Sequence, residues 1–145
     1  MIVKLADNEE KLKQAFAIRM EVFVKEQGVP ADIELDEYDA SPEACRHFVA
    51  YSDGKPIAAG RFKDYETGVA KMQRIAVLKD YRGTGVGRRL LIAMEEEAKR
   101  AGYRESVLDA QRTAEAFYAK AGYATESTEP FLDAGIWHVR MRKRL

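Results

Sequence analysis

A glycine-rich turn that runs directly into a helical pattern constrains the fold of this chain more than any other feature. The stretch VLKDYRGTGVGRRLLIAMEEEAKRAGY covers residues 77–103 and carries glycine at every second position, at Gly83, Gly85 and Gly87. Apolar residues after the turn recur with helical period, which predicts a helix that ends near Arg100. We expect the strand before the turn and the strand ESVLDA after the helix to be parallel, because a helix of this length makes a crossover.

Two further helices are expected from apolar periodicity. The first starts near Asp7, where Glu10 follows three residues later as in a capping box, and it ends before the turn at 28–30. Its inner face is expected to consist of Leu12, Phe16, Met20 and Phe23. The inner face of the helix after the glycine turn is expected to consist of Leu90, Leu91, Met94 and Ala98, with EEEAKR outside. The segment TAEAFYAKAGY predicts a short third helix that ends at Gly122.

The remaining periodic segments predict a largely antiparallel sheet. IVKLA at the start is a weak first strand, and RHFVAYS, PIAAGRFK and VAKMQRIAVL form a meander with turns at DGK and DYETG. YATES and IWHVRMRK are expected to close the sheet, whereas the acidic ADIELDEYDASPEA is expected to form a long loop, with or without a helical turn. The chain is therefore expected to be a single α+β (mixed α/β) domain over residues 1–145. It would have a central mixed, mostly antiparallel sheet flanked by helices.

Composition excludes several classes of function. The 145 residues carry a formal net charge of zero, which gives no overall attraction to nucleic acid or membranes. The single cysteine, Cys45, cannot form an intrachain disulfide, and two scattered histidines make no metal signature. No apolar run approaches a membrane span and the N-terminus is unlike a signal peptide, so a cytoplasmic protein is expected. Both a monomer and a homodimer remain open.

The glycine turn suits an anionic ligand. A plain strand-to-helix turn would need fewer glycines, whereas free N–H groups at a helix start favour an anion. Arg82, Arg88 and Arg89 add positive charge beside the turn. The P-loop is excluded because no Lys-Ser/Thr pair is present, and the dinucleotide fingerprint is excluded because arginine stands at its last glycine position.

The pattern that does fit is R-x-x-G-x-G, formed by Arg82, Gly85 and Gly87. It resembles the turn of the GNAT superfamily of acetyl-CoA-dependent N-acetyltransferases. A second feature is Gln111 seven residues before Tyr118, which is similar to a GNAT segment that more often has asparagine at the first position. The N-terminal RMEVFVKEQGVPADIELDEYD and the C-terminal DAGIWHVRMRK resemble a group of small, poorly characterised bacterial GNAT proteins.

The resemblance implies the donor side of a site. Acetyl-CoA would be the cosubstrate, with no metal, and the acceptor would be the amine of a small molecule or peptide. Tyr118 is the expected catalytic acid beside the leaving thiolate. The expected cofactor-binding residues are Ile75, Ala76, Val77, Arg82, Gly83, Thr84, Gly85, Val86, Gly87, Arg88 and Gln111.

The acceptor side is less defined. Ser106 occupies the position where some GNAT proteins carry a glutamate base, so the base could instead be Glu26, Glu34, Asp109 or His138, or a water relay. The acidic loop could attract a cationic amine or could be a solvated loop. The expected acceptor-binding residues are Glu26, Glu34, Asp36, Asp39 and His138. A catalytic role for Cys45 is not expected, because most lone cysteines are small structural residues.

Three functions remain in view. The leading one is direct transfer of an acetyl group from acetyl-CoA to an amine. The missing glutamate at Ser106 keeps open a non-catalytic module that binds acetyl-CoA. The N-terminal pattern that includes Arg19, Glu34, Asp36 and Asp39 is also similar to acyl-homoserine-lactone synthases, which share the fold but are longer.

Overall fold

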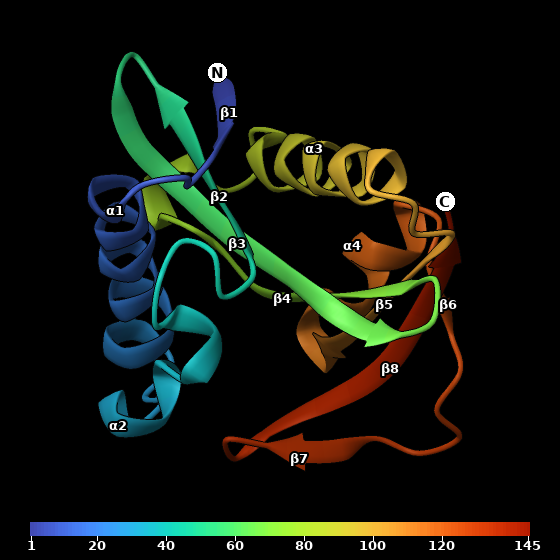
Figure 1. Ribbon diagram of the computed structural model, residues 1–145. Helices are drawn as coiled ribbons and strands as arrows, with labels where there is room; N and C mark the ends of the chain where they lie inside the picture. The colour runs from blue at the N-terminus through green and yellow to red at the C-terminus, as the bar shows by residue number, and fades with distance from the viewer.

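One mixed sheet runs through the whole molecule (Figure 1). The computed structural model describes residues 1–145. The strand order is β1-β2-β3-β4-β5-β8-β6, with β7 paired to β8, and only β4 and β5 are parallel neighbours. The strands are β1 Ile2–Leu5, β2 Arg46–Ser52, β3 Lys55–Glu66, β4 Val69–Val77, β5 Glu105–Gln111, β6 Ala124–Thr125, β7 Phe131–Asp133 and β8 Ile136–Arg144.

Helical segments cover both faces of this sheet. The α-helices are α1 Glu9–Arg19, α2 Ala31–Glu34, α3 Val86–Arg100 and α4 Glu115–Lys120. Shorter turns are η1 Met20–Glu26, which has π-helical geometry, and the 3₁₀ turns η2 Glu37–Asp39, η3 Lys79–Tyr81 and η4 Arg112–Ala114. The predicted fold class, the meander and the parallel crossover are confirmed. None of the helices has the length and hydrophobicity needed to span a bilayer.

The alternation of side chains along the central strands builds two cores. Val49 and Ala59 pack with Ala15, Ile18 and other residues on the α1 face of the sheet. Phe48, Ala50 and Ala58 point to the opposite face, where α3 lies. The helix after the glycine turn buries the four apolar residues that its period predicts, namely Leu90, Leu91, Met94 and Ala98.

A backbone irregularity in β4 opens the sheet. The β3–β4 register shifts between Ala59 and Arg61, and Arg74 takes a left-handed conformation with φ of 57°. Pairing of β4 with β5 covers only the four residues from Val69 to Met72, so the two strands separate beyond that point. The edge of β4 over residues 73–77 therefore faces a gap instead of a neighbouring strand.

Several local predictions are wrong, and tertiary contacts explain them. The cap of α1 is Asn8 rather than Asp7, because the Asn8 side chain accepts from the Lys11 N–H. Glu95 is buried rather than exposed, since it accepts hydrogen bonds from Tyr123 and Lys143. The turn expected at DYETG is confined to the last two residues of that segment, because β3 continues to Glu66. On α1 and η1 the buried residues are Leu12, Ala15, Ile18, Arg19 and Val22, so Phe16, Met20 and Phe23 lie only partly inside.

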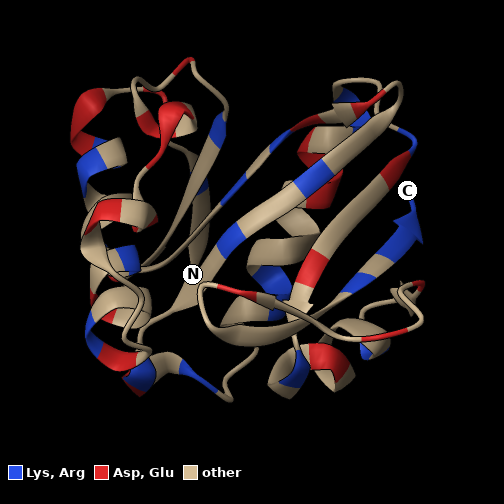
Figure 2. Ribbon diagram, turned by 90° about the horizontal axis from the view of Figure 1, so that it is seen from below, with Lys and Arg blue, Asp and Glu red and all other residues tan.

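The basic C-terminal strand is largely neutralised. In Figure 2, acidic and basic residues lie close to one another along the strands of the sheet. Arg140 pairs with Asp109, and Arg142 pairs with both Glu105 and Glu126. Lys143 pairs with Glu95, so Arg144 is the only lysine or arginine of β8 without an ion pair.

Candidate active site

The gap beside β4 is part of a cleft of about 780 Å³. Its walls come from η1, the outer half of β4, the start of α3, the end of β5, α4 and the β7–β8 hairpin. The predicted site residues that line it are Ile75, Ala76, Val77, Arg82, Gly83, Gly85, Gly87, Arg88, Gln111, Tyr118, Glu34 and His138. Those that do not line it are Thr84, Val86, Glu26, Asp36 and Asp39. The structure thus brings the two predicted motifs to one place.

The glycine turn presents free backbone N–H groups to this cleft. Gly83 and Gly85 have φ of 75° and 87°, a region that side chains rarely allow. Gly85 is the N-cap of α3, no side chain caps this end, and a hydrogen bond closes the first turn from Arg89 N–H to Gly85 O. The preceding N–H groups have no helical acceptor and, with the helix dipole, favour an anion.

Two neighbours in the turn face elsewhere. The Thr84 hydroxyl donates to the carbonyl of Tyr81, and the Val86 side chain is buried in the core under α3. Only the backbone of these residues can therefore serve a ligand. Gly87 has ordinary φ, and a Cβ there would make ordinary van der Waals contact, at 3.5 Å, with Phe117 and Val77 of the cleft wall.

The predicted arginines differ in their availability. Arg82 donates through Nε to the Val77 carbonyl at 2.9 Å and pairs with Glu26 at 2.9 Å. The hydrogen bond from Arg82 lowers the pKa of Glu26 below its usual range, and Glu26 does not reach the cleft. Arg88 is exposed, lines the cleft and has no acidic partner. The Arg88 side chain is therefore free to pair with a phosphate group.

The unpaired edge of β4 offers a backbone donor. Leu78 donates to Ile57 in β3, so the peptide groups of the preceding residue, Val77, point to the opposite edge and into the cleft. The Val77 carbonyl accepts a hydrogen bond from Arg82, whereas the Val77 N–H has no partner in the protein and is free to donate into the cleft. Ile75 and Val77 pack against the main core, and Ala76 is buried on the α1 face.

Tyr118 lies in the cleft wall on α4. Its ring makes edge contacts with Phe117 and Tyr123 at centroid distances of 5.0 and 5.9 Å. Burial raises the pKa of Tyr118 to about 12, so its phenol stays protonated at neutral pH. The Tyr118 hydroxyl makes no hydrogen bond within the protein. Every polar side-chain atom shielded from solvent does have a partner, so the Tyr118 hydroxyl is not shielded and reaches the open cleft.

Gln111 and Gln27 form a reciprocal amide pair across the cleft mouth. Gln111 Nε2 donates to Gln27 Oε1 at 2.8 Å, and the return bond measures 3.4 Å. The pair joins the end of β5 to the end of η1, 84 residues apart in the chain. Gln27 was not predicted as a site residue, because nothing in the neighbouring sequence indicates a partner so distant in the chain.

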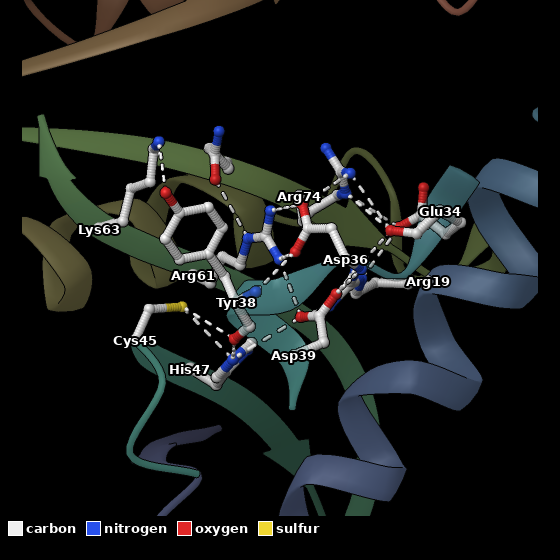
Figure 3. Close-up of polar contacts among 11 residues, drawn as sticks. Arg19, Glu34, Asp36, Tyr38, Asp39, Cys45, His47, Arg61, Lys63 and Arg74 are labelled. Atoms are coloured by element: carbon white, nitrogen blue, oxygen red, sulfur yellow. Dashed lines mark hydrogen bonds and ion pairs between the residues drawn. The ribbon is translucent and has the colours of Figure 1, made fainter. Parts of the chain in front are cut away.

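The acidic segment is a set of ion pairs rather than a solvated loop (Figure 3). Glu34 and Asp39 are buried, and both accept from the buried Arg19. Arg61 holds Asp36 and Asp39 at 2.7 and 2.8 Å. These carboxylates are thus occupied by guanidinium groups, and the expectation that Asp36 and Asp39 form a field for a cationic amine is wrong. The residues similar to lactone synthases are the ones that build this network.

Arginine charges also fix the ionisation of Asp39. Burial alone would raise the pKa of Asp39, but hydrogen bonds and charge from Arg19 and Arg61 outweigh it and hold that pKa well below its usual range. Arg74 extends the network to the cleft, with Nε 3.2 Å from Glu34 Oε2. Arg74 was not predicted, because nothing in its sequence neighbourhood indicates its partner Glu34, which lies 40 residues earlier in the chain.

Ser106 and Cys45, for which the sequence predicts no catalytic role, lie outside the cleft. Ser106 is fully buried and shares a hydrogen bond with the Tyr123 hydroxyl, which donates to the buried Glu95 of α3, so this position does not face the cleft. Burial raises the pKa of Cys45 to about 11, which keeps its thiol protonated and unreactive, as expected.

His138 and Asp109 enter the cleft from β8 and β5. Asp109 accepts two bonds from Arg140 and lies 3.2 Å from Lys71 Nζ. Burial would raise the pKa of Asp109, but Arg140 and Lys71 lower it overall. His138 is buried, and its Nδ1 lies 2.7 Å from the Ile136 carbonyl. Among residues 1–145, no three His, Cys, Asp or Glu side chains are grouped to hold a metal.

Comparison with known proteins decides the family. The model of the acetyltransferase (GNAT) domain matches residues 7–145. The N-acetyltransferase YjcF of Bacillus subtilis, itself uncharacterized, is 47% identical over 139 residues, which are 96% of each chain. The chain belongs to the GNAT family of acetyltransferases.

Solved structures agree with this assignment. A candidate N-acetyltransferase from Lactobacillus plantarum superposes with a TM-score of 0.91 at 32% identity, covering 99% of this chain and 97% of the other. The PaiA N-acetyltransferase of Thermoplasma acidophilum, solved in complex with coenzyme A, shares the fold with a TM-score of 0.71 at 21% identity, covering 100% of both chains. This GNAT protein is thus an acyltransferase of the N-acetyltransferase type.

Proposed function

We propose that this GNAT protein transfers the acetyl group of acetyl-CoA to the amine of an acceptor by direct attack. The observation that supports it most is the glycine turn with free N–H groups beside Arg88 at one end of the cleft that Tyr118 also lines. An anion of pyrophosphate type fits a helix start of this kind. The module that only binds acetyl-CoA and the lactone synthase are not favoured, because the family and the relatives are acetyltransferases.

Each part of the cleft has a defined task. Gly83, Gly85 and Arg88 would hold the pyrophosphate, and Gln111 would lie along the arm that leads to the thioester. The thioester of acetyl-CoA supplies an activated acyl carbon when it is bound. The Val77 N–H would donate to the thioester oxygen as negative charge develops on it.

Tyr118 would assist the departing sulfur. With a pKa of about 12 for the phenol against roughly 8.5 for a thiol, full proton transfer is uphill by roughly 3.5 units, or about 5 kcal/mol. A hydrogen bond from Tyr118 to the thiolate, stronger in the transition state than before it, therefore contributes more than complete protonation does.

We also propose that the acceptor brings no large positive charge besides its reacting amine. Of the three acids that line the cleft, Glu34 is already paired with Arg74 and Asp109 with Arg140 and Lys71, so only Asp133 has no ion pair. Val29, Ile33, Ile136 and other apolar residues line the same end. Small alkylamines and arylalkylamines fit this lining better than polyamines.

The proposed function is tested by release of free thiol from acetyl-CoA. The acceptors should include alkylamines, arylalkylamines, spermidine, amino acids and peptides, with S-adenosylmethionine as the lactone-synthase control. We expect release with at least one uncharged-tail amine and acetylation of its nitrogen. Binding of coenzyme A without release on any amine would support a binding module instead.

A further inference from the structure

We propose that His138 is the general base of this site, with its Nε2 accepting the proton that the attacking amine releases. The inference rests on the proposed acetyl transfer and names a role that the glycine turn and Tyr118 leave open. His138 lies on β8, beside Gln111 in the β5–β8 register.

The hydrogen bond of Nδ1 fixes the tautomer of His138. Nδ1 lies 2.7 Å from the carbonyl oxygen of Ile136. A carbonyl can only accept, so Nδ1 carries the hydrogen, and in the neutral ring Nε2 then has a free lone pair. This is the form that can take a proton at once.

The free Nε2 opens to the cleft. Every polar side-chain atom that is shielded from solvent in this protein has a hydrogen-bond partner. Nε2 of His138 has no such partner, so it is not one of the shielded atoms. Nε2 must therefore reach solvent, although His138 as a whole is only 8% exposed. Since His138 lines the cleft, Nε2 meets solvent there.

The ring is held in this orientation. Phe131 on β7 stacks on the imidazole at a centroid distance of 6.1 Å and an angle of 22°. Phe131 and His138 are also register partners in the β7–β8 hairpin. Stacking on one side and the Ile136 bond along the strand together place the ring, as a proton acceptor requires.

The rival bases are engaged elsewhere. The Glu34 carboxylate is held by Arg19 and Arg74, and both oxygens of Asp109 accept from Arg140. A carboxylate that a guanidinium holds in this way is a poor proton acceptor. Glu26 lies outside the cleft, paired with Arg82.

Few uncompensated charges lie around His138. The elements packed against β8, the strand of His138, are β5, β6, β7 and η4. Their ionisable groups and those of β8 are Glu105, Asp109, Arg112, Asp133, Arg140, Arg142, Lys143 and Arg144. Asp133 and Arg144 have no ion pair, and Asp133 lines the cleft, so Asp133 is the alternative base that an experiment must separate from His138.

The proposed reaction moves one acetyl group and one proton. The amine nitrogen forms a bond to the thioester carbon, and Nε2 of His138 takes one N–H proton. The carbon–sulfur bond then breaks with a hydrogen bond from Tyr118 to the thiolate. The imidazolium proton passes through water to the thiolate, which leaves an amide, a coenzyme A thiol and both side chains as they began.

The tautomer is measurable without any acceptor. Nitrogen-resolved NMR of the free protein at pH 8, with His138→Gln for assignment, should show His138 in its Nδ1–H form. His47 is an internal reference of the opposite kind, because its Nε2 lies 2.8 Å from the Tyr38 carbonyl and must donate. A predominant Nε2–H form of His138 would overturn the proposal.

The kinetic test uses the fastest amine of the acceptor panel. We expect His138→Gln to lower kcat/KM by about 10²-fold or more, with the KM for acetyl-CoA changed by less than about threefold. Free imidazole should restore part of the rate of His138→Ala, which a merely structural role would not allow. A loss below about threefold, or a loss of about 10²-fold in Asp133→Asn instead of in His138→Gln, overturns the assignment. If the wild type releases no thiol with any amine, the proposed acetyl transfer itself is refuted. If the wild type is active and the His138 variants are equally active, only the role of His138 as general base is refuted.

Discussion

Arg19 and Asp39 meet as a two-pronged ion pair inside the protein. Arg19 Nη1 and Nη2 lie 2.7 and 2.8 Å from the two carboxylate oxygens of Asp39, and both side chains are almost fully buried. The pair ties α1 to the acidic segment and, through Glu34 and Arg74, to the bulge of β4. We infer that this network supports the geometry of the cleft more than it contacts any acceptor.

Removal of one member of the network should destabilise the fold. Asp39→Asn leaves the charges of Arg19 and Arg61 buried with one partner fewer, and loss of a buried partner costs about 3–5 kcal/mol. Urea unfolding monitored by circular dichroism measures this cost. The matched control is Asp32→Asn, an exposed acid of the same segment, which should change the free energy of unfolding by less than about 0.5 kcal/mol. Equal effects of both substitutions would contradict the network.

Acid should weaken the protein through the same carboxylates. The pKa values of Asp36 and Asp39 are lowered in the folded protein despite burial, because arginines hold the charged forms, and Asp109 behaves alike. Their contribution to stability is complete above the unfolded pKa of about 3.9 and is lost as the pH falls through their folded pKa values. The free energy of unfolding should therefore fall below about pH 4. Stability that is unchanged from pH 6 to pH 2 would contradict this account.

Two adjacent arginines on α3 should differ in their effect on the cofactor. Arg88 lines the cleft, whereas the neighbouring Arg89 is exposed outside it. Arg88→Ala should weaken coenzyme A binding by about tenfold, since a charge-assisted hydrogen bond contributes about 1.5–3 kcal/mol. Arg89→Ala, with the same change of charge, should bind nearly as the wild type does. Equal weakening in calorimetry would indicate only a general charge effect.

Tyr118→Phe should slow the reaction without unfolding the protein. The loss of a hydrogen bond to the leaving thiolate predicts a fall in kcat of about 10²-fold. The control is Tyr123→Phe, whose hydroxyl bonds Ser106 and Glu95 in the core and should lower stability instead. Because the pKa of Tyr118 is about 12, the wild-type rate should show no alkaline loss from this group below about pH 11. A fall in kcat of less than threefold would remove Tyr118 from the mechanism.

The conformation of the glycine turn and the placement of Tyr118 in the same cleft could be predicted because their signals are local. The glycines, the helix that follows and Tyr118 lie within 40 residues, and each conformation depends mainly on its own sequence. The positive φ of Gly83 and Gly85 is what the turn requires. The parallel crossover follows from the length of the helix between two strands.

The acceptor half could not be predicted because its partners are distant in sequence. Arg61 neutralises Asp36 from 25 residues away, and Arg74 contacts Glu34 from 40 residues away. The strand β7 has only three residues, which are too few for a periodic signal. The sequence DAG, which begins at the last residue of β7, indicates only a turn. Without that strand, nothing in the sequence shows that Phe131 stacks on His138.

Calorimetric titration of coenzyme A tests the central claim most directly. We expect the wild type to bind one coenzyme A per chain, and Gly85→Ala, with φ of 87° at the N-cap of α3, to weaken binding at least tenfold. Gly102→Ala, with φ of 100° at the other end of α3, carries similar backbone strain and should keep the wild-type affinity. Absence of coenzyme A binding by the wild type, or equal loss in both variants, would contradict the glycine turn as the cofactor site.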